Sequence, residues 1–476
     1  MSRSKRSWAV YPAAYRAEAL KIVAEWIKAG ESGSIIGLAG AGKSNLLSFL
    51  SHRPEVLAQY LPGDHQPVVL VHIDLNNLPT VDLATFYRVI LRSLYETGAQ
   101  FAALNPDLEP MIEGRYRKVE DKTDPFLCQS AVREVLLSLQ IEEMRIVLLI
   151  DPFDQFCQVA STPILDSLRG LRDRFKANLT YLIGLRHELA YLRDPAELGE
   201  LYEILDIHQC WVGPMTTTDA RWVMSQVEEM TGQTFTNAQR ARLAELTGGY
   251  PALLRAASLW LVAQLQATTP LLKADTDTWI SALLAEPSLK NRLYELRLGL
   301  TGEEEAALSV LQMALTTGKA TDRHESLRQI EKKHETALHR LETKGICHRG
   351  AGTWQIFSPL FARFMSEAQG LSNGKIWEDV ATARFFLGDQ ELSNLTEKDR
   401  QLLHHFLENP LTVHTLDDLI EAAWPEDDSR GVSDAAVQQA IRHLRKQIEP
   451  NPSQPCYLVN ERGVGYRFFA EGAPRH

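Results

Sequence analysis

Apolar and polar residues follow one another in short blocks along the first half of the chain. Apolar runs bounded by turn residues lie at 34–38, 67–75, 144–150 and 179–185, and stretches with helical periodicity separate them. Continuous apolar runs of this length are typical of parallel strands that are buried on both faces. Their alternation with helices predicts an α/β fold built on a parallel sheet.

The strand pattern stops at about residue 213, and three further blocks follow. Residues 216–266 have helical periodicity, while helices and then a hairpin are predicted within 301–366 and again within 395–469. Helices followed by a hairpin indicate a winged helix. The predicted division is an α/β core over 1–212, a helical lid over 213–295, a winged-helix arm over 296–368, a linker over 369–392 and a second winged-helix domain over 393–476.

Candidate chemistry begins at the glycine-rich turn after the first apolar run. Gly37, Gly42, Lys43 and Ser44 fit the phosphate-binding pattern G-x-x-x-x-G-K-[ST]. Glycines let successive N–H groups point at phosphate oxygens, the helix dipole adds positive potential, and the Ser44 hydroxyl can bind Mg²⁺. The alternative is an ordinary turn in a βα unit. The predicted nucleotide-binding residues here are Gly37, Gly40, Ala41, Gly42, Lys43, Ser44 and Asn45.

Two later strands end in residues that could complete this site. Asp151 follows an apolar run, and a carboxylate at that edge of the sheet can hold Mg²⁺. Pro152 stands where many ATPases carry a catalytic Glu, so Asp154 is the candidate for activating water, with a helix N-cap as its alternative. Arg186 follows the strand 179–185 and could sense a γ-phosphate, or be a surface residue. Slow, Mg²⁺-dependent hydrolysis is expected.

Composition narrows the class of protein. The 476 residues carry a net charge of −11, which argues against non-specific coating of nucleic acid. The five cysteines form no C-x-x-C pair, which is typical of reduced thiols in the cytoplasm. No apolar run is long enough to predict a signal peptide or a membrane span, so we expect no membrane partner.

Positive charge is concentrated on one helix of the last block. Residues 391–476 contain 9 Lys or Arg against 14 Asp or Glu, yet the helix 432–448 has a net positive charge. Such a helix can read base edges in the major groove, although charge alone favours a solvated helix face. The candidate DNA-binding residues are Gln438, Gln439, Arg442, His443, Arg445, Lys446 and Arg462.

The block 395–469 resembles the winged-helix DNA-binding domain of OmpR/PhoB-type response regulators. The matching residues include Leu395-Thr396-Glu397-Lys398, Asn409-Pro410, the run from Ile441 to Ile448 and Arg462-Gly463-Val464-Gly465-Tyr466-Arg467-Phe468. The resemblance implies that 432–448 is the recognition helix and that Arg462 enters the minor groove. His443 and Ala435 stand where many relatives carry Arg, so base specificity does not carry over.

Residues 10–290 resemble the STAND class of P-loop ATPases, which is related to AAA+ ATPases. The matching stretches are Gly37 to Leu47, Ile150 to Asp154, Leu185-Arg186 and Gly249-Tyr250-Pro251. The resemblance implies that ATP and ADP bind with Mg²⁺ and that Pro251 contacts the nucleotide. From sequence pattern alone, 248–251 could equally be a plain turn between two helices.

Together these features predict an ATP-controlled, sequence-specific DNA-binding switch, used in transcriptional regulation. Its partners would be double-stranded DNA and, in the ATP-bound state, further copies of the chain. The alternative is a conflict-system or transposon-type ATPase that oligomerises on a protein or ligand trigger, with the DNA domain as a tether. A fragment from about Gly388 to His476 is expected to fold alone.

Overall fold

The computed structural model divides the chain into two compact units. One unit comprises Met1–Trp279 and Asn291–Pro359, and the other comprises Ile280–Lys290 and Leu360–His476. The described residues are 8–63, 66–267, 273–316, 320–350, 353–369, 374–379, 384–388, 390–410, 412–424, 432–449, 451–452, 455–461, 464–470 and 472.

A parallel five-stranded sheet, in the order β2-β3-β4-β1-β5, forms the centre of the first unit. The strands are β1 (Gly33–Ile36), β2 (Val68–Asp74), β3 (Arg145–Asp151), β4 (Leu179–Leu185) and β5 (Gln209–Trp211). The predicted parallel α/β fold is therefore confirmed. The fifth strand escapes prediction because it has only three residues, of which Cys210 alone is buried.

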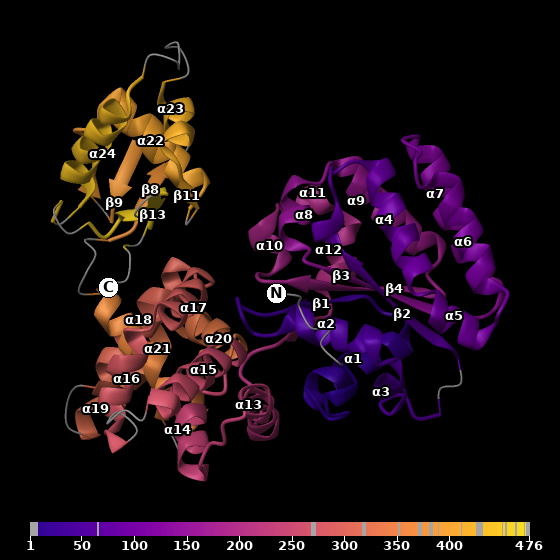
Figure 1. Ribbon diagram of the computed structural model, residues 1–476, viewed down its shortest axis with the longest axis horizontal. Coiled ribbons are helices and arrows are strands. Elements are labelled where there is room, and N and C mark those ends of the chain that lie inside the picture. Colours follow the sequence, from indigo (N-terminus) through magenta and orange to yellow (C-terminus); the bar gives the residue numbers. More distant parts are fainter. Residues whose placement is uncertain are drawn as a thin grey trace. The chain divides into compact units, whose positions relative to one another are not determined.

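Helices cover both faces of this sheet (Figure 1). Alternate strand residues face opposite layers, so that Val147 and Leu149 pack with α1–α3 while Ile146 and Leu148 pack on the other side. This double burial explains the continuous apolar runs. One layer is α1 (Ala17–Ala29), α2 (Lys43–His52) and α3 (Pro54–Ala58). The other is α4 (Leu83–Glu96), α5 (Gly98–Leu104), α6 (Leu108–Val119), α7 (Pro125–Ile141), α8 (Asp154–Val159), α9 (Thr162–Arg174), α10 (Leu189–Leu192), α11 (Pro195–Leu198) and α12 (Glu200–Asp206). Short 3₁₀ turns span Trp8–Val10 and Leu75–Asn77.

A helical region follows the sheet. Thr216 caps α13 (Thr217–Thr231), and a capping box of Thr236 and Gln239 starts α14 (Asn237–Thr247). Gly248, at φ 57°, ends α14, and α15 spans Pro251–Ala267. This confirms the predicted helical stretch 216–266.

The third predicted block has the expected order of helices and hairpin. Its elements are α18 (Gly302–Thr316), α19 (Ala320–Lys333), α20 (Glu335–Thr343) and the antiparallel strands β6 (Cys347–Gly350) and β7 (Thr353–Ile356). Before them, α16 (Thr276–Leu284) and α17 (Pro287–Leu298) contribute residues to both units. The Lys344 ammonium and the Glu304 carboxylate form a fully buried ion pair of 2.8 Å within this block.

The second unit contains a winged helix with two small antiparallel sheets, β10-β9-β8 and β11-β13-β12. Its helices are α21 (Pro359–Gln369), α22 (Glu397–Glu408), α23 (Leu416–Ala423) and α24 (Asp434–Ile448), and its strands are β8 (Ile376–Asp379), β9 (Arg384–Leu387), β10 (Gln390–Glu391), β11 (Val413–His414), β12 (Leu458–Glu461) and β13 (Gly465–Phe468). No helix in the described ranges is long and apolar enough to cross a membrane.

One segment differs from its predicted role. Residues 369–392 read as a linker, but 376–391 carry β8, β9 and β10. Ile376, Phe385 and Leu387 are buried in the same core as the helices α22 and α24. Strands of two to four residues are too short for their periodicity to be visible in the sequence. The other boundaries of the five-part division stay predictions.

Candidate nucleotide-binding and DNA-binding sites

The glycine-rich loop connects β1 to α2 at the carboxyl edge of the sheet. Gly40 and Gly42 have φ angles of 78° and 94°, in the left-handed region that glycine adopts without strain. Gly37 needs to be glycine for another reason, since a Cβ there would clash with the Val212 carbonyl oxygen. The loop leads directly into α2, whose first residue is Lys43, so the free N–H groups of a helix N-terminus face it.

The Lys43 side chain lies back along this loop. Its Nζ donates a 2.8 Å hydrogen bond to the Gly37 carbonyl, and the residue is buried. Burial lowers the pKa of Lys43, whereas the nearby carboxylates of Asp154 and Asp151 act to raise it. The structure thus brings Asp151 and Asp154 close enough to Lys43 for their carboxylates to interact electrostatically with its ammonium group.

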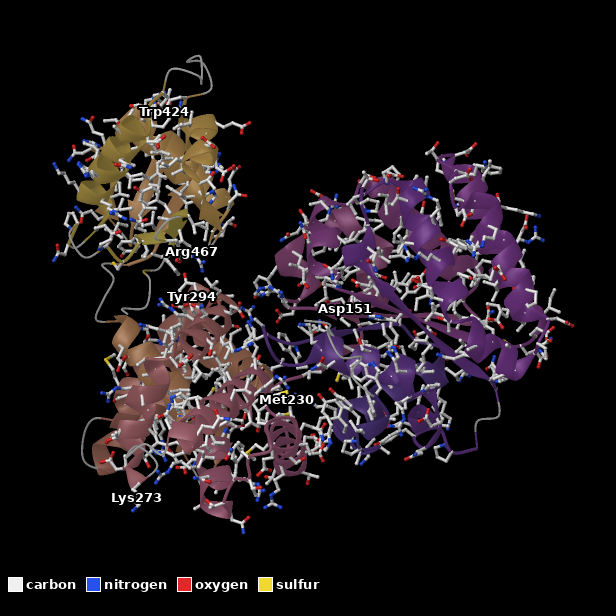
Figure 2. All side chains as sticks on the ribbon, viewed as in Figure 1. Asp151, Met230, Lys273, Tyr294, Trp424 and Arg467 are labelled. Carbon is white, nitrogen blue, oxygen red and sulfur yellow. The ribbon has the colours of Figure 1, made fainter. Side chains whose placement is uncertain are left out.

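Asp151 ends β3 at the same edge and is labelled in Figure 2. It is buried and pairs in register with Asp74, the last residue of β2. A Cβ at Gly184, on β4, would overlap the Asp151 carboxylate, so that side chain lies against the backbone of the intervening strand. Ser44 is exposed on the first turn of α2. A carboxylate and a hydroxyl are oxygen donors of the kind that Mg²⁺ prefers, so the residues present fit that ion.

Asp154 and Arg186 meet through the backbone. The Arg186 N–H donates a 2.6 Å bond to Asp154 Oδ1, which ties the start of α8 to the end of β4. The N-cap of α8 is Phe153, so Asp154 does not play the alternative role of N-cap. The Arg186 side chain itself is exposed.

The start of α15 packs against the glycine-rich loop. Tyr250 Oη donates to the Ala39 carbonyl (3.0 Å), and the Ala252 N–H donates to the Gly40 carbonyl (3.3 Å). Pro251 lies between them, with its Cγ 3.8 Å from the position of a Cβ on Gly42. The predicted nucleotide-binding residues on the loop and Pro251 are therefore brought together, although they are about 200 residues apart in the chain.

Sequence reasoning misses three residues of this site: Arg16, Gly184 and the Tyr250 hydroxyl. Arg16 donates to the Ala41 carbonyl at 2.8 Å. A glycine inside an apolar strand, as at Gly184, is a signal for a close approach. Arg16 stands in an ordinary helical start, and only the fold shows what its side chain reaches.

The helix α24 presents one polar face in the second unit. Gln438, Gln439, Arg442 and Lys446 are exposed, and positions 438, 442 and 446 share a face because they are four residues apart. The opposite face, with Val437, Ile441, Leu444 and Ile448, is buried in the core.

A comparison with protein-family models matches residues 389–468 to the family described as transcriptional regulatory protein, C terminal. The match covers the helices α22 to α24 and both hairpin strands β12 and β13. Residues 389–468 form an OmpR/PhoB-type winged-helix domain.

Curated relatives of the chain agree with this domain. The alkaline phosphatase synthesis transcriptional regulatory protein SphR of Synechococcus elongatus is 41% identical over 87 residues, which is 18% of this chain and 32% of SphR. The transcriptional regulatory protein YvrH of Bacillus subtilis is 44% identical over 69 residues, or 14% and 28% of the two chains. The chain thus spans about a third of these relatives, which say nothing about its remaining residues.

Among solved structures, a Walker-type ATPase of Pyrococcus abyssi aligns with 75% of this chain and 99% of its own, at 15% identity and a TM-score of 0.42. The ORC2 protein of Aeropyrum pernix aligns with 75% of this chain and 94% of its own, at 11% identity and a TM-score of 0.39. Likeness at this level carries no inference about activity. The P-loop ATPase-like core rests instead on the parallel sheet and on the glycine-rich loop after β1.

Two predicted DNA contacts of the OmpR/PhoB-type domain are engaged inside it. His443 Nδ1 lies 2.8 Å from the buried Asp399 carboxylate of α22. Arg445 Nε donates to the Leu458 carbonyl (2.9 Å), its guanidinium lies over the Tyr466 ring, and burial lowers its pKa. Both side chains therefore hold α24 in place. Arg462 lies outside the described residues.

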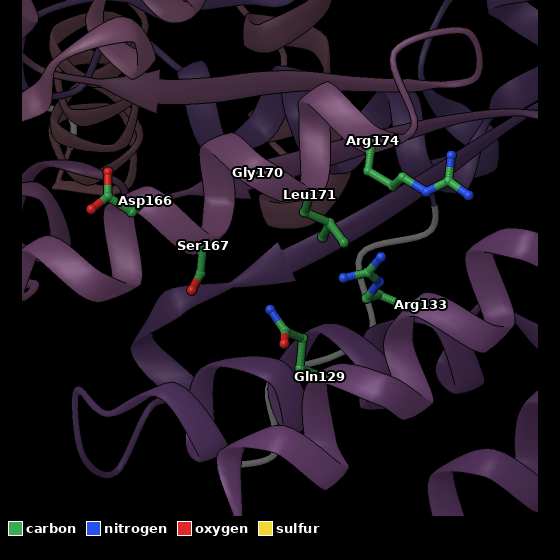
Figure 3. A pocket seen from close by; sticks show the side chains of 7 residues that line it. All are labelled: Gln129, Arg133, Asp166, Ser167, Gly170, Leu171 and Arg174. Atoms are coloured by element: carbon green, nitrogen blue, oxygen red, sulfur yellow. The ribbon is translucent and has the colours of Figure 1, made fainter.

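A hollow of about 270 Å³ lies between α7 and α9 (Figure 3). Arg133 and Arg174 extend beside it, across from Asp166 and Ser167. None of its lining residues is one of the site residues predicted from the sequence.

Proposed function

We propose that this protein is a nucleotide-controlled DNA-binding switch that regulates transcription. The observation that carries the proposal is the union, in one chain, of a parallel sheet with a glycine-rich phosphate-binding loop and an OmpR/PhoB-type domain. In this arrangement the nucleotide bound at the loop would control DNA binding, and the last domain would bind the target DNA.

The nucleotide would lie on the loop 37–45. Lys43 would leave the Gly37 carbonyl to bind β- and γ-phosphates, and Pro251 would contact the nucleotide from α15. Ser44 and Asp151 would hold Mg²⁺, which neutralises phosphate charge when bound. Arg186 would approach a γ-phosphate from its exposed position at the end of β4.

Hydrolysis would be slow. Pro152 occupies the position after Asp151, and Asp154 already accepts the Arg186 N–H through one carboxylate oxygen. Asp154 would therefore be the group that orients water, with reduced freedom to do so. Slow hydrolysis suits a switch, because each nucleotide state then lasts.

DNA would bind on the exposed face of α24. Gln438, Gln439 and Arg442 would face base edges, and Lys446 would contact the phosphate backbone. Arg462 is proposed for the minor groove on the strength of the family resemblance alone.

A chain of contacts inside the first unit supports the coupling. The glycine-rich loop contacts Tyr250 and Ala252, and Gly248 just before them packs against the Phe357 backbone beyond β7. Ser358 Oγ donates to the Leu246 carbonyl at 2.6 Å. A change at the loop would thus reach the predicted winged-helix arm, as expected of a STAND-class ATPase, and so control oligomerisation.

The test combines two measurements on the full chain. Lys43→Ala should lose most ATP affinity, whereas Lys28→Ala, an exposed lysine on α1, should keep it. DNA affinity of the wild type should then differ between ATP and ADP, and this difference should vanish in Lys43→Ala. Unchanged ATP binding in Lys43→Ala contradicts the nucleotide site. Equal DNA affinity in every nucleotide state contradicts the switch and leaves the DNA domain as a tether.

A further inference from the structure

Arg16 is a buried arginine beside the glycine-rich loop. It precedes α1 directly, is 8% exposed, and has a φ of 56° in the left-handed region. This conformation is unfavourable for a non-glycine residue, and such residues persist only where the surrounding structure holds them, often beside functional sites.

The Arg16 guanidinium joins two segments. Nη2 donates to the Ala41 carbonyl of the glycine-rich loop (2.8 Å), and Nη1 donates to the Pro214 carbonyl between β5 and α13 (3.0 Å). The Arg16 backbone N–H lies 3.4 Å from Asp219 Oδ2, in the first turn of α13. Arg16 thus contacts the glycine-rich loop, the segment that connects β5 to α13, and α13 itself, which is the first helix of the helical region.

The hydrogen bond from Arg16 to the Ala41 carbonyl also fixes the direction of the next N–H group, because the peptide between Ala41 and Gly42 is planar. The C=O of Ala41 and the N–H of Gly42 belong to one trans peptide and point in opposite directions. Because the Ala41 oxygen points at the Arg16 guanidinium, the Gly42 N–H is directed away from Arg16. N–H groups aimed in this way form the nest that binds phosphate oxygens. The guanidinium also keeps a positive charge next to that nest.

We propose that Arg16 is a positioning residue for phosphate binding, and that it links the shape of the glycine-rich loop to the Pro214 connection and α13. The inference rests on the proposed nucleotide function. Phosphate that accepts the Gly42 N–H fixes the Ala41–Gly42 peptide in the orientation that Arg16 already holds, and the same guanidinium carries this constraint to the Pro214 carbonyl.

The chain offers a matched control in Arg172. It is also buried, at 3% exposure, and its guanidinium also donates to backbone oxygens, with Nη2 2.6 Å from the Gly30 carbonyl. Gly30 lies before β1, at the edge of the sheet opposite to the glycine-rich loop. Arg172→Ala therefore removes a comparable arginine without touching the proposed site.

The experiment uses the full chain with Arg16→Ala, Arg16→Lys and Arg172→Ala. Affinity for a fluorescent ADP analogue and ADP-induced hydrogen-exchange protection of 213–231 are measured for each. We expect Arg16→Ala to weaken ADP binding by roughly tenfold or more, the loss typical of a buried charged hydrogen bond, and to abolish the added protection. Arg16→Lys should recover part of the affinity through its charge, but not the protection, because lysine lacks the rigid pair of Nη donors that serve the two carbonyls separately.

Each other outcome overturns the inference. Wild-type ADP affinity and protection in Arg16→Ala would contradict the inference. An equal loss of ADP affinity in Arg172→Ala would also contradict it, because the effect would then come from a general loss of stability. If Arg16→Ala does not fold, protection of 213–231 in Arg16→Lys decides in the same way. Failure of the wild type to bind ADP at all is distinguishable, because it removes the proposed function first.

Discussion

The charged side chains of α24 fall into two groups. Arg442 and Lys446 are exposed, while His443 and Arg445 contact Asp399 and Leu458. Successive side chains on a helix point about 100° apart, so residues that are adjacent in the sequence can lie on the buried face and on the exposed face of α24. We therefore expect substitutions at these positions to separate stability from DNA affinity.

Arg445→Ala should destabilise the domain. It removes the hydrogen bond to the Leu458 carbonyl and the packing over Tyr466, a loss of about 1–3 kcal/mol for a partly buried charged donor. Urea unfolding of a fragment 374–476 would measure it. Lys446→Ala, on the exposed face, is the control and should change stability by less than about 0.5 kcal/mol.

Arg442→Ala should act on DNA and not on folding. An exposed arginine that contacts phosphate should lower the slope of log affinity against log salt by about 0.9, and one that contacts a base should cost about 1–3 kcal/mol on the cognate site. A salt-titrated binding series separates the two. Unchanged affinity and slope together would remove Arg442 from the interface.

At the scale of elements, the short strands β8 and β9 belong to the winged-helix core. Ile376, Phe385 and Leu387 are buried with Leu402 and Phe468. The Tyr457 hydroxyl also donates to the Gly374 carbonyl at 2.7 Å. The domain is therefore larger than the helix-and-wing pattern that the sequence makes visible.

A fragment starting at Gly374 should be more stable than the one predicted to start at Gly388. The shorter fragment loses three buried apolar side chains, each of which stabilises a fold by about 1.5–3 kcal/mol. Thermal unfolding of 374–476 and 388–476 compares them directly. Equal midpoints would show that β8 and β9 contribute nothing to the core.

Gly248→Ala should loosen the junction between α14 and β7. Gly248 has a φ of 57°, which costs a non-glycine residue about 1–2 kcal/mol, and a Cβ would overlap the Phe357 backbone. We expect a lower unfolding temperature and reduced coupling of nucleotide to DNA affinity. Gly232→Ala is the control, because it shares a positive φ, at 70°, but has open space around its Cβ position.

The elements that sequence could predict are the long and strongly patterned ones. The strands that end in Asp151 and Leu185 carry seven residues each, and their apolar runs reveal them. β5, β8 and β9 have three or four residues and depend on distant neighbours. The same holds for the site: Lys43 belongs to a local motif, whereas the contacts of Arg16 and Arg445 exist only through the fold.

At the scale of the whole molecule, the net charge of −11 should lower the affinity of the chain for DNA. Like charges repel over about 10 Å at moderate salt, so the acidic chain should repel DNA and weaken binding through the proposed recognition helix α24. Multiple copies on neighbouring sites would offset this through effective concentration.

The full chain should therefore bind a single site weakly and tandem sites tightly in its ATP state. Binding to DNA with one and with two copies of a selected site, at several salt concentrations, measures this. Equal affinity for both DNAs would indicate that one copy suffices.

Because β4 lies beside β3 in the sheet, Gly184 determines how much room the Asp151 carboxylate has. β4 separates β1 from β3, and the Asp151 carboxylate at the end of β3 lies over the backbone of Gly184 on β4, where a Cβ would overlap it. Gly184→Ala would therefore displace this carboxylate while leaving every proposed ligand in the sequence. A survey of ligand residues alone would then score such a variant as intact, although its Asp151 carboxylate would no longer occupy the same place. The proposed Mg²⁺ site would thus depend on the missing side chain of Gly184 as much as on the groups around it.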